Sequence, residues 1–170
     1  MYLINNQLCV ISDSFCYWIP TEEDIYQDIQ GNHDYFDFSN YDDDHPNFDT
    51  SNHLIPGKFK DEMGGKLILE FVGLRAKMYS ILKYDGESKN TAKGVIRSVK
   101  EKQITHSDYK ETLFEKKQMS HIGTKIMQEK HGLFTAEVKK ISLSPFNDKK
   151  WISREGDQFT SFSFGHHRIK

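Results

Sequence analysis

Short β-type segments that end in turn signals recur along this sequence, and they limit what the chain can fold into. Residues 7–19 are rich in aromatic and β-branched types, and Ser12-Asp13-Ser14 interrupts them, which predicts a β-hairpin with a polar tip. On the same grounds, further strands are expected at 66–72, 77–84, 134–143 and 159–164. The first two of these should flank a bend at Gly73-Leu74-Arg75, and Asp85-Gly86 is a turn signal that ends the second.

Helical patterns are few and short. Thr21 followed by three acids predicts a helix over 22–30, because acidic side chains favour the positive end of the helix macrodipole. A second helix is expected at 106–117, with Ser107 as its cap. Its apolar face would consist of Tyr109, Leu113 and Phe114. Residues 31–56 lack periodicity, and we expect an irregular connection whose aromatic side chains attach it to the surface. The predicted fold class is α+β.

Length and composition allow one modest domain, or part of a larger one. With 170 residues, of which 36% are hydrophobic, the chain is long enough for a core of its own. It has no apolar run near the roughly 20 residues that a membrane helix needs. Its first residues also lack the basic-then-apolar order of a signal peptide. We therefore expect a soluble, intracellular protein without a membrane partner.

The small net charge of −2 conceals a strong split along the chain. Residues 1–65 contain 2 Lys/Arg and 13 Asp/Glu, a net charge of −11, whereas residues 66–170 contain 21 and 12, a net charge of +9. A basic surface of this extent indicates a polyanion partner, because each phosphate that Lys or Arg neutralises releases condensed counterions. Charge alone leaves open the alternative of a solvated basic face without nucleic acid.

The cysteines and the acidic run indicate no metal site. Cys9 and Cys16 lack Cys-x-x-Cys spacing and a clustered histidine, and we interpret them as ordinary half-buried residues outside any disulfide framework. Asp42-Asp43-Asp44-His45 is interpreted as a solvated loop, because consecutive acids point in different directions and stay hydrated.

The order of several motifs along the chain indicates a family. A hairpin tip with a carboxylate is followed by a Thr-led helix and an acidic link. Next come Gly-Lys-Phe-Lys-Asp-Glu-Met-Gly-Gly-Lys at 57–66, Glu-Phe-Val-Gly-Leu-Arg-Ala-Lys-Met-Tyr-Ser at 70–80 and Thr-Ala-Lys-Gly-Val at 91–95. This succession covers nearly the whole chain and closely resembles the carboxy-terminal end of the family B DNA polymerases of Polinton (Maverick) transposable elements. Those enzymes are relatives of the protein-primed polymerases of adenoviruses, some phages and linear plasmids.

The resemblance implies an architecture and a set of partners. Residues 1–85 would form the end of the polymerase palm, and residues 86–170 a basic, strand-rich, thumb-like region with one or two short helices. The implied activity is template-directed nucleotidyl transfer to a DNA 3′ end. The implied partners are a DNA primer-template, dNTP, Mg²⁺ and a terminal protein, and the implied location is the nucleus or a virus-like replication site.

The resemblance assigns the catalytic, metal-binding role to Asp13. The palm hairpin of the family carries Tyr-x-Asp-Thr-Asp-Ser, in which Asp13 matches the second aspartate, whereas Cys9 replaces the tyrosine and Ile11 the first aspartate. Nucleotidyl transfer commonly uses two divalent ions about 4 Å apart, which carboxylates hold. The upstream motifs of the family would precede residue 1, so we expect this chain alone to be inactive. Without the resemblance, an aspartate between two serines is typical of a hydrogen-bonded turn.

The resemblance also implies DNA contacts. Lys77-Met78-Tyr79 matches the Lys-x-Tyr motif that contacts the primer-template in the family. Alternation on a strand would place Lys77 and Tyr79 on the same side, a cation for phosphate beside a ring for sugar or base. Arg75 and Lys93 are further expected phosphate contacts, the latter because the adjacent Gly94 lets a backbone approach. For each of these, a solvated surface charge is the plain alternative.

Two other interpretations of the whole chain remain open at this point. It could be a non-catalytic DNA-binding remnant that kept the basic half, as the replacement of an aspartate by Ile11 suggests. It could also be a degraded, transposon-derived fragment, because a palm hairpin without its neighbouring strands exposes sheet edges.

Overall fold

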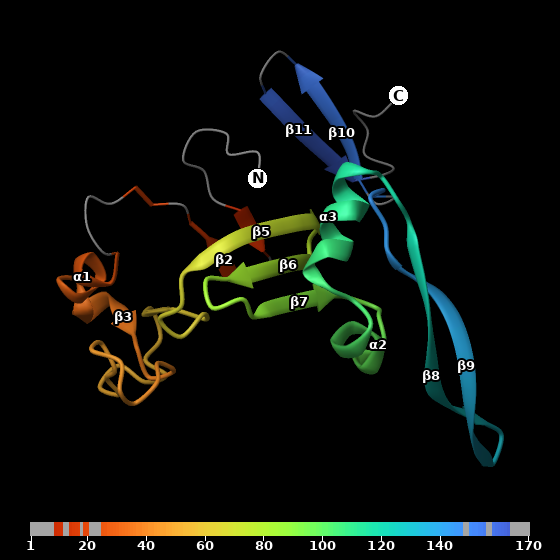
Figure 1. Ribbon diagram of the computed structural model, residues 1–170, viewed down its shortest axis with the longest axis horizontal. Coiled ribbons are helices and arrows are strands. Elements are labelled where there is room, and N and C mark those ends of the chain that lie inside the picture. Colours follow the sequence, from red (N-terminus) through yellow and green to blue (C-terminus); the bar gives the residue numbers. More distant parts are fainter. Residues whose placement is uncertain are drawn as a thin grey trace. The chain divides into compact units, whose positions relative to one another are not determined.

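The computed structural model describes residues 9–11, 14–17, 19–20, 25–147, 150–155 and 158–163 (Figure 1). The chain divides into two compact units. Unit 1 contains residues 1–71 and 81–89, and unit 2 contains residues 72–80 and 90–170. Each unit has buried side chains of its own.

The secondary structure is mixed, with about 18% helix and 41% strand. The helices are α1 (Ile25–Gln30), α2 (Arg97–Lys102), α3 (His106–Phe114) and the 3-10 turn η1 (His33–Tyr35). The strands are β1 (Cys9–Ile11), β2 (Ser14–Cys16), β3 (Phe36–Asp37), β4 (Phe59–Lys60), β5 (Ile68–Arg75), β6 (Met78–Lys83), β7 (Ser88–Ala92), β8 (Met119–Glu129), β9 (Gly132–Leu143), β10 (Lys150–Glu155) and β11 (Gln158–Ser163). This mixture confirms the α+β class in general terms.

The strands form several small sheets. Unit 1 contains the antiparallel pair β1-β2 and the short parallel pair β3-β4, and unit 2 contains the antiparallel pairs β8-β9 and β10-β11. Strands β5, β6 and β7 form a three-stranded sheet in that order. The predicted amino-terminal hairpin is confirmed, because β1 pairs with β2 from Cys9 opposite Cys16 to Ile11 opposite Ser14.

Several other predicted elements are confirmed in type. The described part of the helix predicted over 22–30 is α1, and the turn at Asp85-Gly86 is present, with Gly86 at a φ of 86°. The strand predicted at 134–143 lies within β9, and the one predicted at 159–164 overlaps β11.

The turn between β5 and β6 lies further along the chain than expected. The predicted bend at 73–75 is wrong, because β5 runs through these residues and the chain reverses at Ala76-Lys77. Val72 and Leu74 both pack in the core of unit 2, which requires the extended alternation of a strand between them. Lys77 has a φ of 60°, in the left-handed region. Lys77 therefore belongs to the turn and not to the predicted strand.

Unit 1 is organised around two buried aromatic rings and a buried carboxylate. Phe38 and Tyr41 are 1% and 4% exposed, and their ring centroids are 5.3 Å apart. The Asp37 carboxylate accepts the backbone N–H groups of Ser39 at 3.0 Å and Leu54 at 3.3 Å. The segment 31–56 therefore builds a core with its aromatic side chains, where the sequence predicted only attachment to a surface.

A tight turn within the glycine-containing segment 57–66 completes this core. The Asp61 carboxylate accepts the N–H groups of Met63 at 2.8 Å and Gly65 at 2.9 Å, and the Tyr41 hydroxyl at 2.9 Å. Gly65 has a φ of 77°, and a Cβ at this position would lie 2.8 Å from Nε2 of His45. Left-handed backbone and close packing both call for glycine here.

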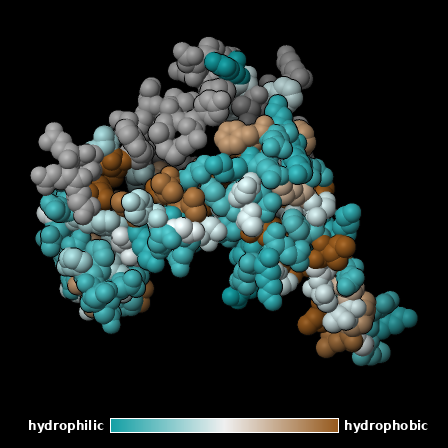
Figure 2. Space-filling view, in the orientation of Figure 1, coloured by the Kyte–Doolittle hydropathy of each residue, from teal (hydrophilic) through white to brown (hydrophobic). Residues whose placement is uncertain are grey.

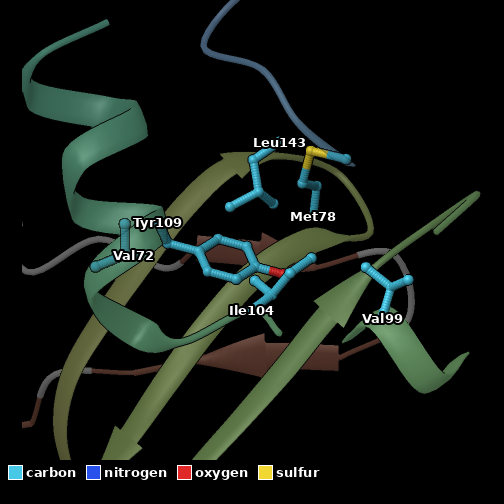
Figure 3. Close-up of a cluster of buried hydrophobic side chains, with 6 residues drawn as sticks. All are labelled: Val72, Met78, Val99, Ile104, Tyr109 and Leu143. Atoms are coloured by element: carbon cyan, nitrogen blue, oxygen red, sulfur yellow. The ribbon is translucent and has the colours of Figure 1, made fainter. Parts of the chain in front are cut away.

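The core of unit 2 is a cluster of buried apolar side chains, which Figure 3 shows. It consists of Val72, Met78, Val99, Ile104, Tyr109 and Leu143. These come from the β5-β6 sheet, from both helices α2 and α3 with their connection, and from the end of β9. The cluster therefore joins the sheet to the longest hairpin of the described residues.

Helix α3 begins with a capping box. The Thr105 hydroxyl accepts the N–H of Asp108, while the Asp108 carboxylate accepts the N–H of Thr105 at 2.7 Å. The predicted cap, Ser107, is therefore wrong. Of the predicted apolar face, Tyr109 is buried, whereas Leu113 and Phe114 are 38% and 58% exposed.

Strands β8 and β9 form a long antiparallel hairpin. At its base Gly123 is buried, and a Cβ there would lie 2.7 Å from Cδ1 of Ile96, so glycine allows the hairpin to pack closely beside α2. Along the hairpin, apolar side chains are exposed (Figure 2), among them Ile122 at 55%, Ile126 at 71% and Leu133 at 76%. The outer part of this hairpin is thus held by strand pairing and not by a core.

Candidate nucleic-acid interface

The two units differ sharply in charge. Counted over its whole sequence, unit 1 contains 5 Lys/Arg and 16 Asp/Glu, a net charge of −11. Unit 2 contains 18 Lys/Arg and 9 Asp/Glu, a net charge of +9. The division into units therefore separates acidic from basic sequence with the same net charges as the division at residue 65, because the residues of 66–71 and 81–89 add no net charge to unit 1. A polyanion would be attracted to unit 2.

Two of the candidate cations meet at one end of the three-stranded sheet. The backbone N–H of Lys93 donates to the carbonyl of Lys77 at 2.9 Å. Lys77 lies in the β5-β6 turn and Lys93 directly follows β7, and both residues are exposed. Gly94 has a φ of 89° and no atom within 4 Å of a Cβ built on it, so the backbone turn, not crowding, favours glycine beside Lys93. The structure thus joins the Lys-x-Tyr and Thr-Ala-Lys-Gly-Val segments.

Arg75 lies on the other side of the same turn, and one of its donors has a structural role. Its Nη1 donates to the carbonyl of Phe146 at 3.2 Å. This bond ties the end of β5 to the segment that follows β9. A guanidinium carries five N–H donors in a planar fork, so this single bond leaves others for a phosphate.

Tyr79 lies farther along β6 and is half-buried. The residues on either side of it, Met78 and Ser80, are 2% and 0% exposed. Strand alternation therefore places Tyr79 on the face of the strand opposite these two side chains. The predicted alternation of Lys77 with Tyr79 is wrong, because Lys77 has left-handed backbone and does not belong to β6. Three candidates converge at the sheet end, and Tyr79 lies next to it.

A buried polar network supports this end of the sheet. The Ser80 hydroxyl donates to Oδ1 of Asn90 at 2.6 Å and lies 2.7 Å from Nδ1 of His106. The Tyr109 hydroxyl donates to the carbonyl of Thr91 at 3.0 Å. Burial raises the pKa of Tyr109, so its hydroxyl stays a protonated donor. These bonds connect β6, β7 and α3, and they hold the two lysine-bearing turns on a fixed support.

The sequence did not single out the β8-β9 hairpin, which is a further basic element of unit 2. Residues 116–140 contain six lysines and two glutamates. His121 pairs directly with Lys140 across the hairpin, and Lys125 and Lys130 are exposed toward its far end. A two-stranded ribbon has dimensions that fit the major groove of duplex DNA. The sequence feature that could have indicated this hairpin is the turn at Lys130-His131 between two basic β-type segments.

Asp13, the predicted catalytic and metal-binding residue, lies outside the described residues. Within the described ranges, no three His, Cys, Asp or Glu side chains are grouped so that they could hold a metal ion.

Comparisons with known proteins do not assign a family to this chain. No family model, no curated protein and no solved structure matches this chain. Among the described residues, no helix combines the length and apolar character that crossing a membrane requires.

Proposed function

We propose that this chain is the carboxy-terminal part of a DNA-directed DNA polymerase of family B, and that unit 2 contacts the primer-template. The observation that carries the proposal is the bond between the Lys93 N–H and the Lys77 carbonyl. It joins two segments on which the family resemblance rests, and it does so on the unit with a net charge of +9.

The arrangement suits a DNA backbone. Lys77 and Lys93 are exposed and come from adjacent turns, so their ammonium groups can neutralise neighbouring phosphates without burial of charge. Arg75, at the end of β5 directly before this turn, adds a planar donor group. None of these contacts reads a base edge, and we therefore expect binding with little sequence preference. The β8-β9 hairpin would extend the contact along the duplex.

We propose that this chain does not transfer nucleotides by itself. Phosphoryl transfer depends on positioning and on neutralising charge at the reacting phosphate. In the resemblance, Asp13 is one carboxylate, and Ile11 stands where the family has another. One carboxylate is not enough to position two divalent ions. Primer-template, dNTP and a terminal protein remain proposed partners of the whole polymerase.

A non-catalytic DNA-binding remnant is the second candidate, and the apolar Ile11 in the family's metal-binding motif favours it. It shares the DNA contacts of unit 2 with the first candidate. The two differ in whether the chain supports nucleotide addition when a separate polypeptide supplies the remaining polymerase motifs.

A pair of assays tests the proposal. Filter binding should show salt-dependent affinity of the purified chain for primer-template DNA, and primer extension with magnesium should show no product. Extension that disappears in Asp13→Ala would prove the chain active and overturn the claim of inactivity. Absence of salt-dependent binding would remove DNA as the partner. Adding a polypeptide with the upstream motifs should restore extension only for a polymerase part, not for a remnant.

A further inference from the structure

The hairpin register brings the two cysteines of the chain together. Cys9 and Cys16 are separated along the sequence, and each lies in a strand of only three residues. In the antiparallel β1-β2 pair they are direct partners, at the end of the hairpin away from the turn. They are also the only two cysteines in the sequence. Contrary to the interpretation from sequence spacing, we infer from this register that Cys9 and Cys16 form a reversible cross-strand disulfide.

Backbone distances in such a pair allow the bond. Directly opposite residues of an antiparallel pair have Cα atoms about 4.5 or 5.5 Å apart, depending on the hydrogen-bonding position. Disulfides usually span Cα separations of about 4.4–6.8 Å. Directly opposite residues of an antiparallel pair also lie on the same face of the sheet. Both requirements follow from the register, so the backbone need not rearrange.

The chemistry needs an oxidant, and a small disulfide such as oxidised glutathione supplies it. Cys16 is half-exposed and is thus a suitable first nucleophile. Its thiolate attacks one sulfur of glutathione disulfide, and one glutathione thiolate leaves. The Cys9 thiolate then attacks the Cys16 sulfur of the mixed disulfide, and the second glutathione leaves. Two protein thiols lose two protons and two electrons, and one glutathione disulfide becomes two molecules of glutathione.

The modification would act on the segment of the sequence that contains Asp13. The disulfide would close a ring of residues 9–16. Two three-residue strands alone give a marginal hairpin. The cross-link would reduce the freedom of the open hairpin and hold its register. This inference concerns the hairpin alone, so it does not depend on the proposed polymerase function.

The test is oxidation of the full chain by graded ratios of oxidised to reduced glutathione, read by intact mass and by maleimide labelling. We expect a product two hydrogens lighter than the reduced chain, with both thiols protected from maleimide and fully recovered by dithiothreitol. Cys9→Ser and Cys16→Ser should each give only mixed disulfides or dimers. Such adducts as the main product of the unmodified chain would overturn the inference.

A register-shifted variant tests whether the folded hairpin, and not only the closeness of the two cysteines in the sequence, promotes disulfide formation. Combining Cys9→Val with Val10→Cys keeps the composition and almost the same loop length, but it places one thiol opposite Phe15 and on the other face. We expect its intramolecular disulfide to form at least tenfold more slowly than that of the natural chain. In guanidinium chloride the two chains should oxidise at similar rates. Equal rates under native conditions would show that the register plays no part.

Discussion

The Ser80 hydroxyl in β6 lies 2.7 Å from Nδ1 of His106, the first residue of α3. Ser80 has one hydroxyl hydrogen, and it is donated to Oδ1 of Asn90. The orientation of the Asn90 amide is fixed in turn, because its Nδ2 donates to the carbonyl of Ile104 at 2.9 Å. Ser80 must therefore accept a hydrogen bond from His106, which places a proton on Nδ1. This relation joins the sheet to α3 in the core of unit 2.

Removing that hydroxyl should destabilise unit 2. Ser80→Ala leaves the half-buried Asn90 oxygen and the His106 N–H without this shared partner, and such a loss typically costs about 1–3 kcal/mol. Urea unfolding should show this decrease in the free energy of unfolding. Ser88→Ala is the matched control, because Ser88 is exposed in the same sheet and should change stability by less than about 0.5 kcal/mol. Equal effects of the two substitutions would mean that the network contributes nothing.

The stability of unit 1 should depend on acid through Asp37. Burial by itself would raise the pKa of Asp37, but hydrogen bonds from Ser39, Leu54 and Lys60 outweigh it and hold the pKa well below its ordinary value of 3.8. A carboxyl whose pKa is lowered on folding stabilises the folded state at pH above its unfolded pKa, and this contribution is lost as the pH falls below about 3.8. The protection of the Ser39 and Leu54 amides from hydrogen exchange, relative to the intrinsic rate at each pH, should therefore fall below that pH.

Asp37→Asn separates this effect from general acid denaturation. The variant should protect the same two amides less at neutral pH, and its protection should fall less on acidification. Asp34→Asn removes an exposed carboxylate from the same segment and should behave like the natural chain. An unchanged pH profile in Asp37→Asn would contradict the assigned role of this carboxylate.

Glycine at position 65 should be more sensitive to substitution than glycine at position 57. Both have left-handed backbone, with φ of 77° and 88°, which costs a residue with a Cβ about 1–2 kcal/mol. A Cβ at Gly65 would also meet His45 at 2.8 Å, whereas one at Gly57 meets no atom within 4 Å. Overpacking of this kind adds about 1–3 kcal/mol. Thermal unfolding of Gly65→Ala and Gly57→Ala compares them directly, and an equal loss would exclude the steric contribution.

Local signals allowed part of the fold to be predicted. The hairpin of β1 and β2 follows from a run of β-type residues with a polar interruption, which acts over a few residues. The cap of α3 could also have been inferred from the sequence, because Thr105 and Asp108 have the spacing of a capping box. The prediction chose Ser107 instead. Strand β8 was not predicted, because most of its residues are exposed on both faces and give no apolar alternation.

The candidate site depends on contacts that no local pattern records. The prediction of Lys77 on a strand failed because the chain continued as β5 to keep Val72 and Leu74 in the core, which moved the turn. The meeting of Lys77 with Lys93 depends on β7 lying beside β6, and β7 itself was not predicted. Identity and charge of the candidate residues could be inferred from sequence, but their convergence required the sheet.

The salt dependence of DNA binding tests the central claim most directly. In the natural chain, log affinity for a primer-template should fall linearly with log salt. Lys77→Ala combined with Lys93→Ala should lower the slope by about two phosphate equivalents, each about 0.9 on this scale. The control combines Lys66→Ala with Lys83→Ala, which removes the same charge from unit 1, where the two lysines pair with Asp85 and Glu87. We predict a slope unchanged in the control and reduced in the Lys77 and Lys93 variant. Equal slopes in the natural chain and both variants would contradict the proposal that the joined turns of unit 2 hold the DNA backbone.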